Sequence, residues 1–380
     1  MIMHNYAKKI VKSLIKKITN IPMESAWRGG LYKEYNNKDI QDAYKTLLDG
    51  HGNELGLEIC QVYGNKNGIV TITSDDGDYH TAIQFDKLSK KYSIPVTISA
   101  PVYKVYPRIK EWKKLLENRY LELVNHSYNH YRMDENWKHA RNEKKLIHEL
   151  IHSQLFFNKY FDVPQYLFVC PENIICNMGL DILKKHGVIA MRGYGPGYNS
   201  LIIEDGFKNG QWLNLNSLTI IDIPREEGKD LRKMRNQWLL EAASRKWLIE
   251  QWHNIDTPGF QTIDFQEADQ IFKDIKKYSE EYNLWLASFS DAVKYLKEYE
   301  SAKLQSWVEN GFIYIFISVE CDCRFDSYYP LSVILEKNKL SKVTSLYNDI
   351  SSSTVMDIIP NKLYKFRLDK LEEQENEELC

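Results

Sequence analysis

The sequence lacks a long apolar run, an excess of charge of one sign, and a cysteine framework. No apolar run approaches the roughly 20 residues that a membrane-spanning helix needs. Lys plus Arg number 50 and Asp plus Glu 52, so the net charge of −2 excludes a chain-wide attraction to nucleic acid. The six cysteines are too sparse for a disulfide scaffold, and they include no CxxC pair, which excludes the paired-CxxC type of zinc site. What remains is typical of a globular protein, with 43% hydrophobic and 27% charged residues.

Residues 1–23 form a basic segment with five lysines and no acidic residue. Their apolar residues recur at helical spacing, which predicts an amphipathic helix. Lysines interrupt any apolar core that a secretory signal would need, so we expect a cytoplasmic protein. One hypothesis is that the helix contacts an anionic membrane on its inner face. The alternative is that it packs on the main domain with its lysines in water.

The central part of the chain alternates short β-branched runs with helical stretches. The predicted strands are 69–73, 95–100, 121–125, 166–170, 188–192, 219–224, 247–253 and 284–288. Such alternation predicts an α/β fold with a parallel sheet, and its length suits a barrel.

The regions before and after this central domain lack its alternating strand and helix pattern. We expect an N-terminal extension over 24–64, the barrel over 65–302, a small β-rich accessory domain over 303–370 and an acidic tail over 371–380. Within the barrel domain, Ser288 and Asp291 predict a capping box that opens a last helix.

Two polar motifs follow predicted strands. The first is Thr73-Ser74-Asp75-Asp76-Gly77, in which one carboxylate can bind a metal while the other acts as a base. Taken alone, this motif is also typical of an ordinary Asp-Gly turn. The second contains His126 and His130, and two histidines four residues apart are a common metal-binding arrangement, although surface histidines are also ordinary.

The two motifs support each other because parallel strands of a barrel end on the same face. Asp76, His126 and His130 would then supply three ligands and leave a position open for water. Zinc lowers the pKa of such a water to about 7, and Asp75 would be free to take its proton. His253 follows another strand and is a candidate general acid, although a lone histidine in a loop has many roles.

These motifs resemble those of the polysaccharide deacetylases with the NodB homology domain, carbohydrate esterase family four. The family's T-F-D-D-G motif is similar to residues 73–77, and its H-[ST]-x-x-H motif is similar to residues 126–130, in the same order. The resemblance covers roughly residues 65–298 and implies a distorted (β/α) barrel. It also implies removal of an acetyl group from an N-acetylated sugar.

The resemblance further implies a role for each matched residue. Asp75 would be the general base, and Asp76, His126 and His130 would hold a divalent metal, usually zinc. His253 would protonate the leaving amine.

The third motif departs from the family, because the run around Pro171 lacks the arginine that orients the base. Arg192 and Arg225 are candidates to replace it by their position after predicted strands. We place Pro171, Arg192, Asp222 and Arg225 at the substrate-binding edge of the site.

The sequence therefore predicts a metal-dependent deacetylase acting on an acetylated glycan or a lipid- or nucleotide-linked precursor. A catalytically idle glycan-binding protein on the same scaffold is the alternative, supported by the altered third motif. A non-heme iron oxygenase is a third hypothesis, because two histidines and one carboxylate also suit iron.

Overall fold

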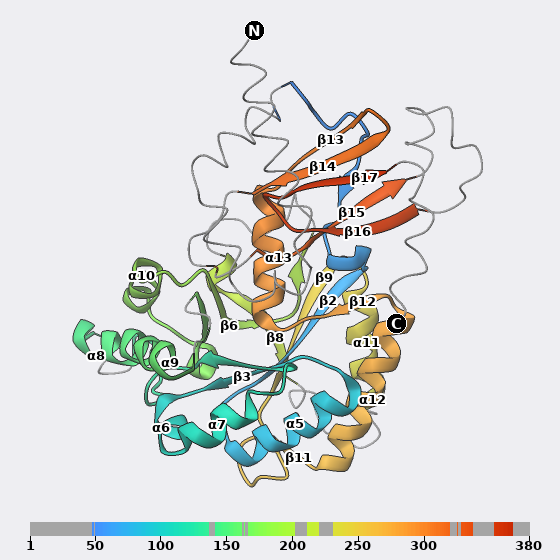
Figure 1. Cartoon of the computed structure of the whole chain (residues 1–380). Coiled ribbons are helices and arrows are strands. Elements are labelled where there is room, and N and C mark those ends of the chain that lie inside the picture. Colours follow the sequence, from blue (N-terminus) through green and yellow to red (C-terminus); the bar gives the residue numbers. More distant parts are fainter. Residues whose placement is uncertain are drawn as a thin grey trace. The chain divides into compact units, whose positions relative to one another are not determined.

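The computed structural model describes residues 48, 50–136, 141–161, 163, 166–201, 211–219, 231–319, 325, 328–336 and 353–367. The chain divides into two compact units, one of Lys66–Val293 and one of Met1–Asn65 with Lys294–Cys380 (Figure 1). The predicted helix over 1–23, the predicted tail over 371–380, and the candidate residues Asp222 and Arg225 lie outside the described residues.

Seven parallel strands form the centre of the first unit, in the order β4-β3-β2-β9-β8-β6-β5. Their bounds are β2 Gly68–Ser74, β3 Val96–Ala100, β4 Leu121–Asn125, β5 Leu167–Val169, β6 Ala190–Pro196, β8 Leu215–Thr219 and β9 Lys246–Trp252. The His126 ring lies 2.8 Å from the carbonyl of Val169, so the ends of the outermost strands β4 and β5 also meet. The predicted distorted (β/α) barrel is confirmed.

Strand β2 changes its neighbour halfway along its length. Its first residues pair with β12 (Leu284–Leu286), and its last residues pair with β3, both in parallel. All seven residues of β2 are buried, as expected of a strand covered on both faces. Strand β8 covers Leu215–Thr219, whereas the sequence predicts a strand over 219–224, of which residues 220–224 lie outside the described residues.

Helices connect the barrel strands: α5 Tyr79–Tyr92, α6 Val102–Val105, α7 Ile109–Leu115, α8 Glu143–Ile147, α9 Ser153–Phe161, α10 Asn177–Lys185, α11 Leu231–Ala242 and α12 Phe265–Glu281. Helix α13, Phe289–Ser301, follows β12 and leads to β13. The predicted capping residue starts α13, since the Ser288 hydroxyl accepts a bond from the Asp291 N–H at 3.2 Å. A π-helical turn, His148–His152, joins α8 to α9. Among the described residues, no helix combines the length and apolarity needed to cross a bilayer.

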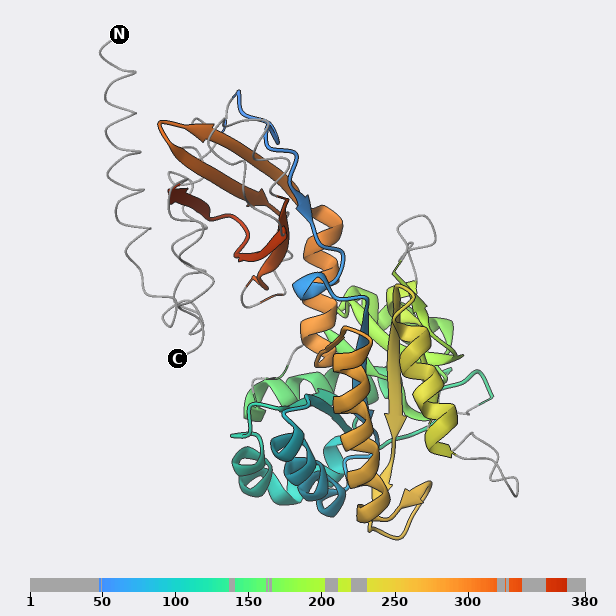
Figure 2. The ribbon, with the colours of Figure 1, turned by 90° about the vertical axis from the view of Figure 1, so that its right-hand side faces the viewer.

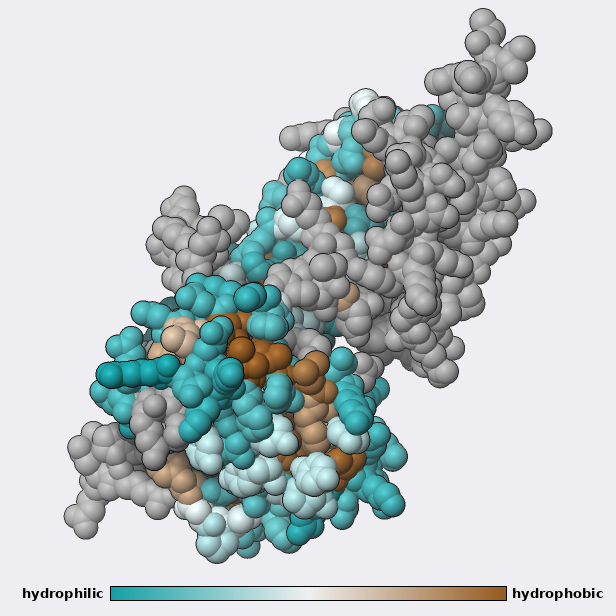
Figure 3. All heavy atoms as spheres, turned by 90° about the vertical axis from the view of Figure 1, so that its left-hand side faces the viewer, coloured by the Kyte–Doolittle hydropathy of each residue, from teal (hydrophilic) through white to brown (hydrophobic). Residues whose placement is uncertain are grey.

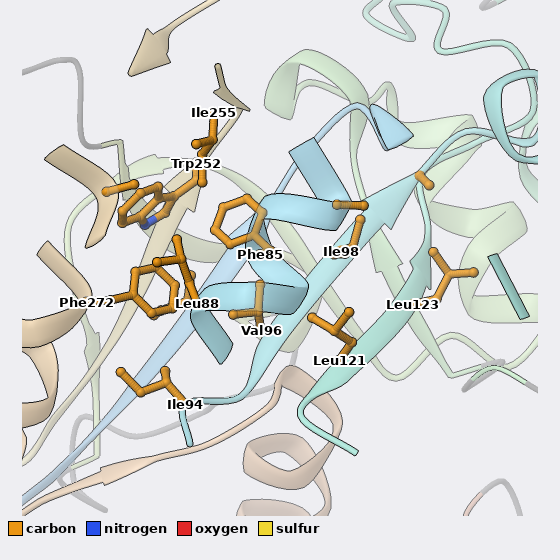
Figure 4. Packing of buried hydrophobic residues seen from close by; sticks show 14 of the residues in the cluster. Phe85, Leu88, Ile94, Val96, Ile98, Leu121, Leu123, Trp252, Ile255 and Phe272 are labelled. Atoms are coloured by element: carbon orange, nitrogen blue, oxygen red, sulfur yellow. The ribbon is translucent and has the colours of Figure 1, made fainter. Parts of the chain in front are cut away.

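Aromatic packing fixes the last residues of β9 against two helices. The Trp252 indole meets Phe85 of α5 edge-on, with ring centroids 5.7 Å apart, and Phe272 of α12, with centroids 5.6 Å apart (Figure 4). All three side chains are almost completely buried. Because His253 directly follows Trp252, this packing also fixes the backbone from which the histidine projects.

The surface of this unit is mostly hydrophilic on the face shown in Figure 3, with a few clusters of hydrophobic residues between the polar ones. Apolar residues scattered over a folded protein's surface are ordinary. The positions of the site residues therefore depend on the internal packing rather than on the surface.

The second unit contains two antiparallel sheets (Figure 2). One joins β13 (Lys303–Glu309), β14 (Phe312–Ser318) and β17 (Leu363–Arg367). The other joins β1 (Glu58–Ile59), β15 (Leu331–Glu336) and β16 (Ser353–Ile358). The described end of the region expected as a separate extension thus pairs with β15 of the C-terminal region.

Candidate functional site

Three potential metal ligands meet where β2 and β4 end. The Asp76 Oδ1 atom lies 3.0 Å from His130 Nε2 and 3.8 Å from His126 Nε2. One ligand atom from each residue falls within 4.8 Å of the others. Asp76 and His130 are partly exposed, whereas His126 is buried, so the cluster lies at the surface end of the barrel.

The two loops that carry these ligands use left-handed backbone. Asp76, Ser127 and His130 have φ angles of 67°, 71° and 58°. The Ser127 hydroxyl accepts a bond from the His130 N–H at 2.9 Å and so closes the tight loop between the two histidines. Non-glycine residues in this region are costly and concentrate at functional sites, where the surroundings hold them in place.

Gly77 is required for the close approach of the first loop to β3. Its φ angle is +57°, and a Cβ atom there would lie 2.3 Å from the Cβ of Ala100. A side chain at this position would push the loop away from the barrel mouth. The glycine of the first motif therefore sets the position of Asp76.

The charges within the cluster favour ionised Asp76. Burial opposes its ionisation, but the hydrogen bonds and charges of His126 and His130 outweigh burial and hold the pKa of Asp76 far below its usual range. Burial also favours the neutral ring of His130, but Asp76 outweighs it and raises the pKa of His130. In the absence of an ion, the carboxylate thus pairs with the imidazoles.

The residues fit a divalent metal. Around a tetrahedral zinc ion with bonds of about 2.0–2.2 Å, neighbouring ligand atoms lie roughly 3.3 Å apart, which is close to the two distances from Asp76. The carbonyl of Val169 accepts a bond from His126 Nδ1 at 2.8 Å, which leaves Nε2 as the nitrogen with a lone pair. Such backing of a ligand histidine is typical of metal sites.

Asp75, next to this cluster, is almost completely buried and accepts four hydrogen bonds. Arg192 donates one from Nη1 to Oδ1, at 2.8 Å, and one from Nη2 to Oδ2. Ser99 donates to Oδ1 at 2.7 Å, and Gln251 donates to Oδ2 at 2.9 Å. Burial raises the pKa of Asp75, but the charge and hydrogen bonds of Arg192 outweigh it and lower the pKa to about 2.

Arg192, one of the two arginines suggested as a replacement for the one that the third motif lacks, contacts Asp75. It comes from β6, is fully buried, and also donates to Thr73 Oγ1 at 2.8 Å and to Asn173 Oδ1 at 3.2 Å. Its contact is with the carboxylate of Asp75, whereas the sequence placed it among the residues at the substrate-binding edge and also suggested it as the replacement for the missing arginine. Its position after a strand was the only sequence signal for this contact.

The altered third motif forms a short turn next to Arg192. Pro171 is buried and begins a 3₁₀ turn, and the following residues Glu172 and Asn173 have φ angles of 52° and 57°. Asn173 bonds both Arg192 and, through its amide nitrogen, Gln251 Oε1 at 3.2 Å. The turn thus holds the arginine rather than supplying it.

His253 follows β9 and is 9% exposed. Burial lowers the pKa of its ring, while the charges of Asp75 and Asp76 act in the opposite direction. The Phe260 ring meets it edge-on, with centroids 4.8 Å apart. Among the described residues, its Nδ1 atom has no hydrogen-bond partner.

Sequence reasoning missed Ser99, Gln251 and Asn173. These side chains contact Asp75 or Arg192; Ser99 and Gln251 stand in stretches without a motif, and Asn173 stands in the altered third motif. The one available signal was the polar residue near the end of a predicted buried strand, which applies to Ser99 on β3 and Gln251 on β9.

Comparison with known proteins gives distant structural likenesses. No family model and no curated protein matches the chain. Among solved structures, a family 4 carbohydrate esterase from Streptomyces lividans in complex with acetate matches at a TM-score of 0.40 and 13% identity, over 58% of this chain and 92% of the other. A family 4 acetyl xylan esterase from Clostridium thermocellum in complex with a cobalt ion matches at 0.41 and 14%, over 60% and 91%.

A wild-type pseudoenzyme of carbohydrate esterase family 4 from Bacillus anthracis also matches, with a TM-score of 0.41 and 14% identity, over 60% of this chain and 66% of the other. All three structures are described as members of the family that the sequence motifs resemble.

Proposed function

We propose that this chain is a metal-dependent hydrolase that removes an acetyl group from an N-acetylated sugar. The observation that carries the proposal is the position of the ligand cluster Asp76, His126 and His130 beside a buried carboxylate, Asp75, that an arginine orients. A divalent metal bound by the three ligands would supply Lewis-acid polarisation of a carbonyl and would acidify a water molecule.

The protein's own residues would then move the protons. Water adds to the acetamide carbon, the C–N bond breaks, and acetate and a free amine leave. Asp75 accepts the proton of the attacking water, and Arg192 keeps this carboxylate ionised and fixed in one orientation. His253 donates a proton to the departing nitrogen, and its lowered pKa makes the protonated ring a ready donor.

The proposed substrate is an acetylated sugar or oligosaccharide, either free or linked to a nucleotide or lipid. The support for this class is the resemblance of the two sequence motifs to those of sugar deacetylases, together with the site geometry. The linkage rests on the expected cytoplasmic location alone, so the experiment must compare the linked and unlinked forms.

A second candidate is a glycan-binding protein that does not catalyse. The observation in its favour is that Asp75 already accepts four hydrogen bonds, which is about the number that the lone pairs of a carboxylate can accept. A base in this state must give up one of these hydrogen bonds before it accepts a proton. This candidate predicts bound metal and sugar without acetate release.

A screen for released acetate separates the two candidates. The substrates would be N-acetylated oligosaccharides, O-acetylated oligosaccharides and acetylated nucleotide-sugars, each with purified full-length protein. We expect acetate release that a chelator abolishes and Zn²⁺ restores, with elemental analysis to distinguish zinc from iron. Zinc and sugar binding without acetate from any substrate would favour the non-catalytic protein.

A further inference from the structure

The loop between the two histidine ligands is held from outside the barrel by the helix that follows it. The Glu149 carboxylate accepts the backbone N–H of Asn129 at Oε2, 2.8 Å away, and the Asn129 side-chain N–H at Oε1, 2.6 Å away. Asn129 stands directly before His130. The Glu149 carboxylate therefore accepts both the backbone and a side-chain N–H of Asn129, the residue next to the candidate ligand His130.

The fold buries Glu149 at the position where it makes this contact. It is 2% exposed, and it lies in the π-helical turn His148–His152 that interrupts the helical stretch between α8 and α9. Turns of this kind occur often at functional sites. The Ser153 hydroxyl donates to the backbone carbonyls of Glu149 and Leu150, at 2.7 and 2.8 Å, and makes no contact with the Glu149 carboxylate.

The residues that precede Asn129 and Glu149 also contact each other. The ring of Tyr128 packs on the ring of His148, with centroids 4.3 Å apart and an interplanar angle of 47°. Two successive residues of the ligand loop, Tyr128 and Asn129, thus dock on two successive residues of the π turn. The loop is attached over its whole centre and not only at one hydrogen bond.

The loop needs this attachment because its backbone is strained. Ser127 and His130 both have left-handed φ angles, a conformation that non-glycine residues keep only when their surroundings hold them. The internal bond from the His130 N–H to the Ser127 hydroxyl closes the loop but does not fix its direction. The bonds to Glu149 supply the external support.

We propose that Glu149 is the positioning residue that sets the metal affinity of the site, by holding the Ser127–His130 loop so that the His130 ring faces Asp76. This inference rests on the proposed metal site but not on the proposed reaction. Glu149 itself does not bind the metal, because its two carboxylate oxygens are occupied by Asn129. Partners of this kind commonly change metal affinity about ten- to hundredfold when they are removed.

The test is the affinity of the full-length protein for Zn²⁺ alone, measured by competition with a chromophoric chelator. In Glu149→Gln the amide oxygen still accepts one hydrogen bond from Asn129. The amide NH₂ group faces the other N–H of Asn129, so the second hydrogen bond is lost. We expect the zinc dissociation constant to rise about ten- to hundredfold. Amide hydrogen exchange at residues 127–130 of the metal-free protein should become faster in the same variant.

Two further variants control for general damage to the helix. Ser153→Ala removes hydrogen bonds from the same π turn without touching the Glu149 carboxylate, and its zinc affinity should stay within about twofold of wild type. Asn129→Ala removes the side-chain donor to Glu149 Oε1 and leaves the backbone N–H bond to Oε2 in place. It should weaken zinc binding even if Glu149→Gln does not fold.

Three results would overturn the inference. The first is unchanged zinc affinity in both Glu149→Gln and Asn129→Ala, and the second is an equal loss of affinity in Ser153→Ala. The third is wild-type protein that binds no zinc, which would remove the metal site as well. Zinc binding by wild type without acetate release would overturn only the proposed reaction and would leave the role of Glu149 intact.

Discussion

The barrel unit contains two buried arginine–carboxylate pairs that are alike in chemistry and different in surroundings. Arg192 binds Asp75 with two terminal nitrogens at the end of the barrel. Arg235 of α11 binds Glu250 of β9 through one nitrogen, at 2.6 and 2.7 Å from the two carboxylate oxygens. All four side chains are at most 3% exposed.

The difference begins with the alternation of side chains along β9. Glu250 and Gln251 are successive residues, so their side chains point to opposite faces of the strand. Gln251 reaches Asp75 inside the barrel, whereas Glu250 faces the helix and also accepts the indole N–H of Trp252 at 3.2 Å. Only the inner pair lies next to the ligand cluster. Burial and pairing are therefore common to both carboxylates, and only its neighbours make Asp75 a candidate for catalysis.

The largest expected effect separates the two pairs by activity. Asp75→Asn removes the proposed base, so acetate release should fall about a hundred- to ten-thousandfold while the bound zinc remains. Glu250→Gln is the matched control, because it neutralises the outer carboxylate, and the folded fraction of this variant should keep its turnover number. Turnover and zinc content measured on the same samples check both statements. Full activity in Asp75→Asn would show that another group is the base.

The outer pair should instead control stability. Arg235→Met leaves the Glu250 carboxylate buried without its cation, which should cost about 3–5 kcal/mol of unfolding free energy. The double variant Arg235→Met with Glu250→Leu should recover part of that loss, because it removes both buried charges but also takes the acceptor from the Trp252 indole N–H. Denaturant unfolding measures both. A double variant as unstable as the single one would mean that the pair itself stabilises the fold.

A buried carboxylate in the second unit sharpens the comparison through its pH dependence. Burial raises the pKa of Glu298 to about 8, although it accepts the backbone N–H of Tyr329 with both oxygens. Since this folded-state pKa lies above the unfolded value, its contribution to stability is present at low pH and is lost as the pH rises through about 8. Between pH 6 and pH 8 the loss should be on the order of 2 kcal/mol.

Glu298→Gln should remove this pH dependence, as unfolding measurements at several pH values would reveal. The Asp75 carboxylate, whose pKa lies at about 2, should contribute no change over the same interval. An unchanged slope in Glu298→Gln would assign the pH dependence to another group.

The smallest expected effect concerns one of the four bonds to Asp75. Ser99→Ala removes the donor to Oδ1 and leaves the two Arg192 bonds, so turnover should fall only severalfold and stability by about 0.5–1.5 kcal/mol. Steady-state kinetics and unfolding of the same variant measure the two effects. A higher turnover number would mean that the hydrogen bond from Ser99 restrains the proposed base Asp75, which is what the non-catalytic alternative implies.

Much of the barrel was predictable because its strands are short, β-branched and fully buried. The predicted strand over 121–125 coincides with β4, and the strand over 69–73 lies within β2. In the second unit, β13 and β16 are hard to predict, since both carry polar residues that blur the alternation between faces. The pairing of β1 with β15 depends on a contact between distant segments, which local pattern does not encode.

For the candidate site, the cluster of possible metal ligands was predictable and the residues that support it were not. Asp76, His126 and His130 stand in motifs whose spacing points to a metal, and the structure brings them together. Glu149 stands in an ordinary helical stretch, and its relation to the ligand loop appears only when the chain has folded. Short motifs identify groups that react, whereas the residues that orient them come from elsewhere in the sequence.

The most direct test of the central claim is an anomalous difference map from crystals grown with Zn²⁺, recorded on both sides of the zinc absorption edge. The account predicts one strong peak about 2.0–2.2 Å from Asp76 Oδ1 and the Nε2 atoms of His126 and His130. A map without density between these three atoms, with Asp76 turned away from the two rings, would contradict it.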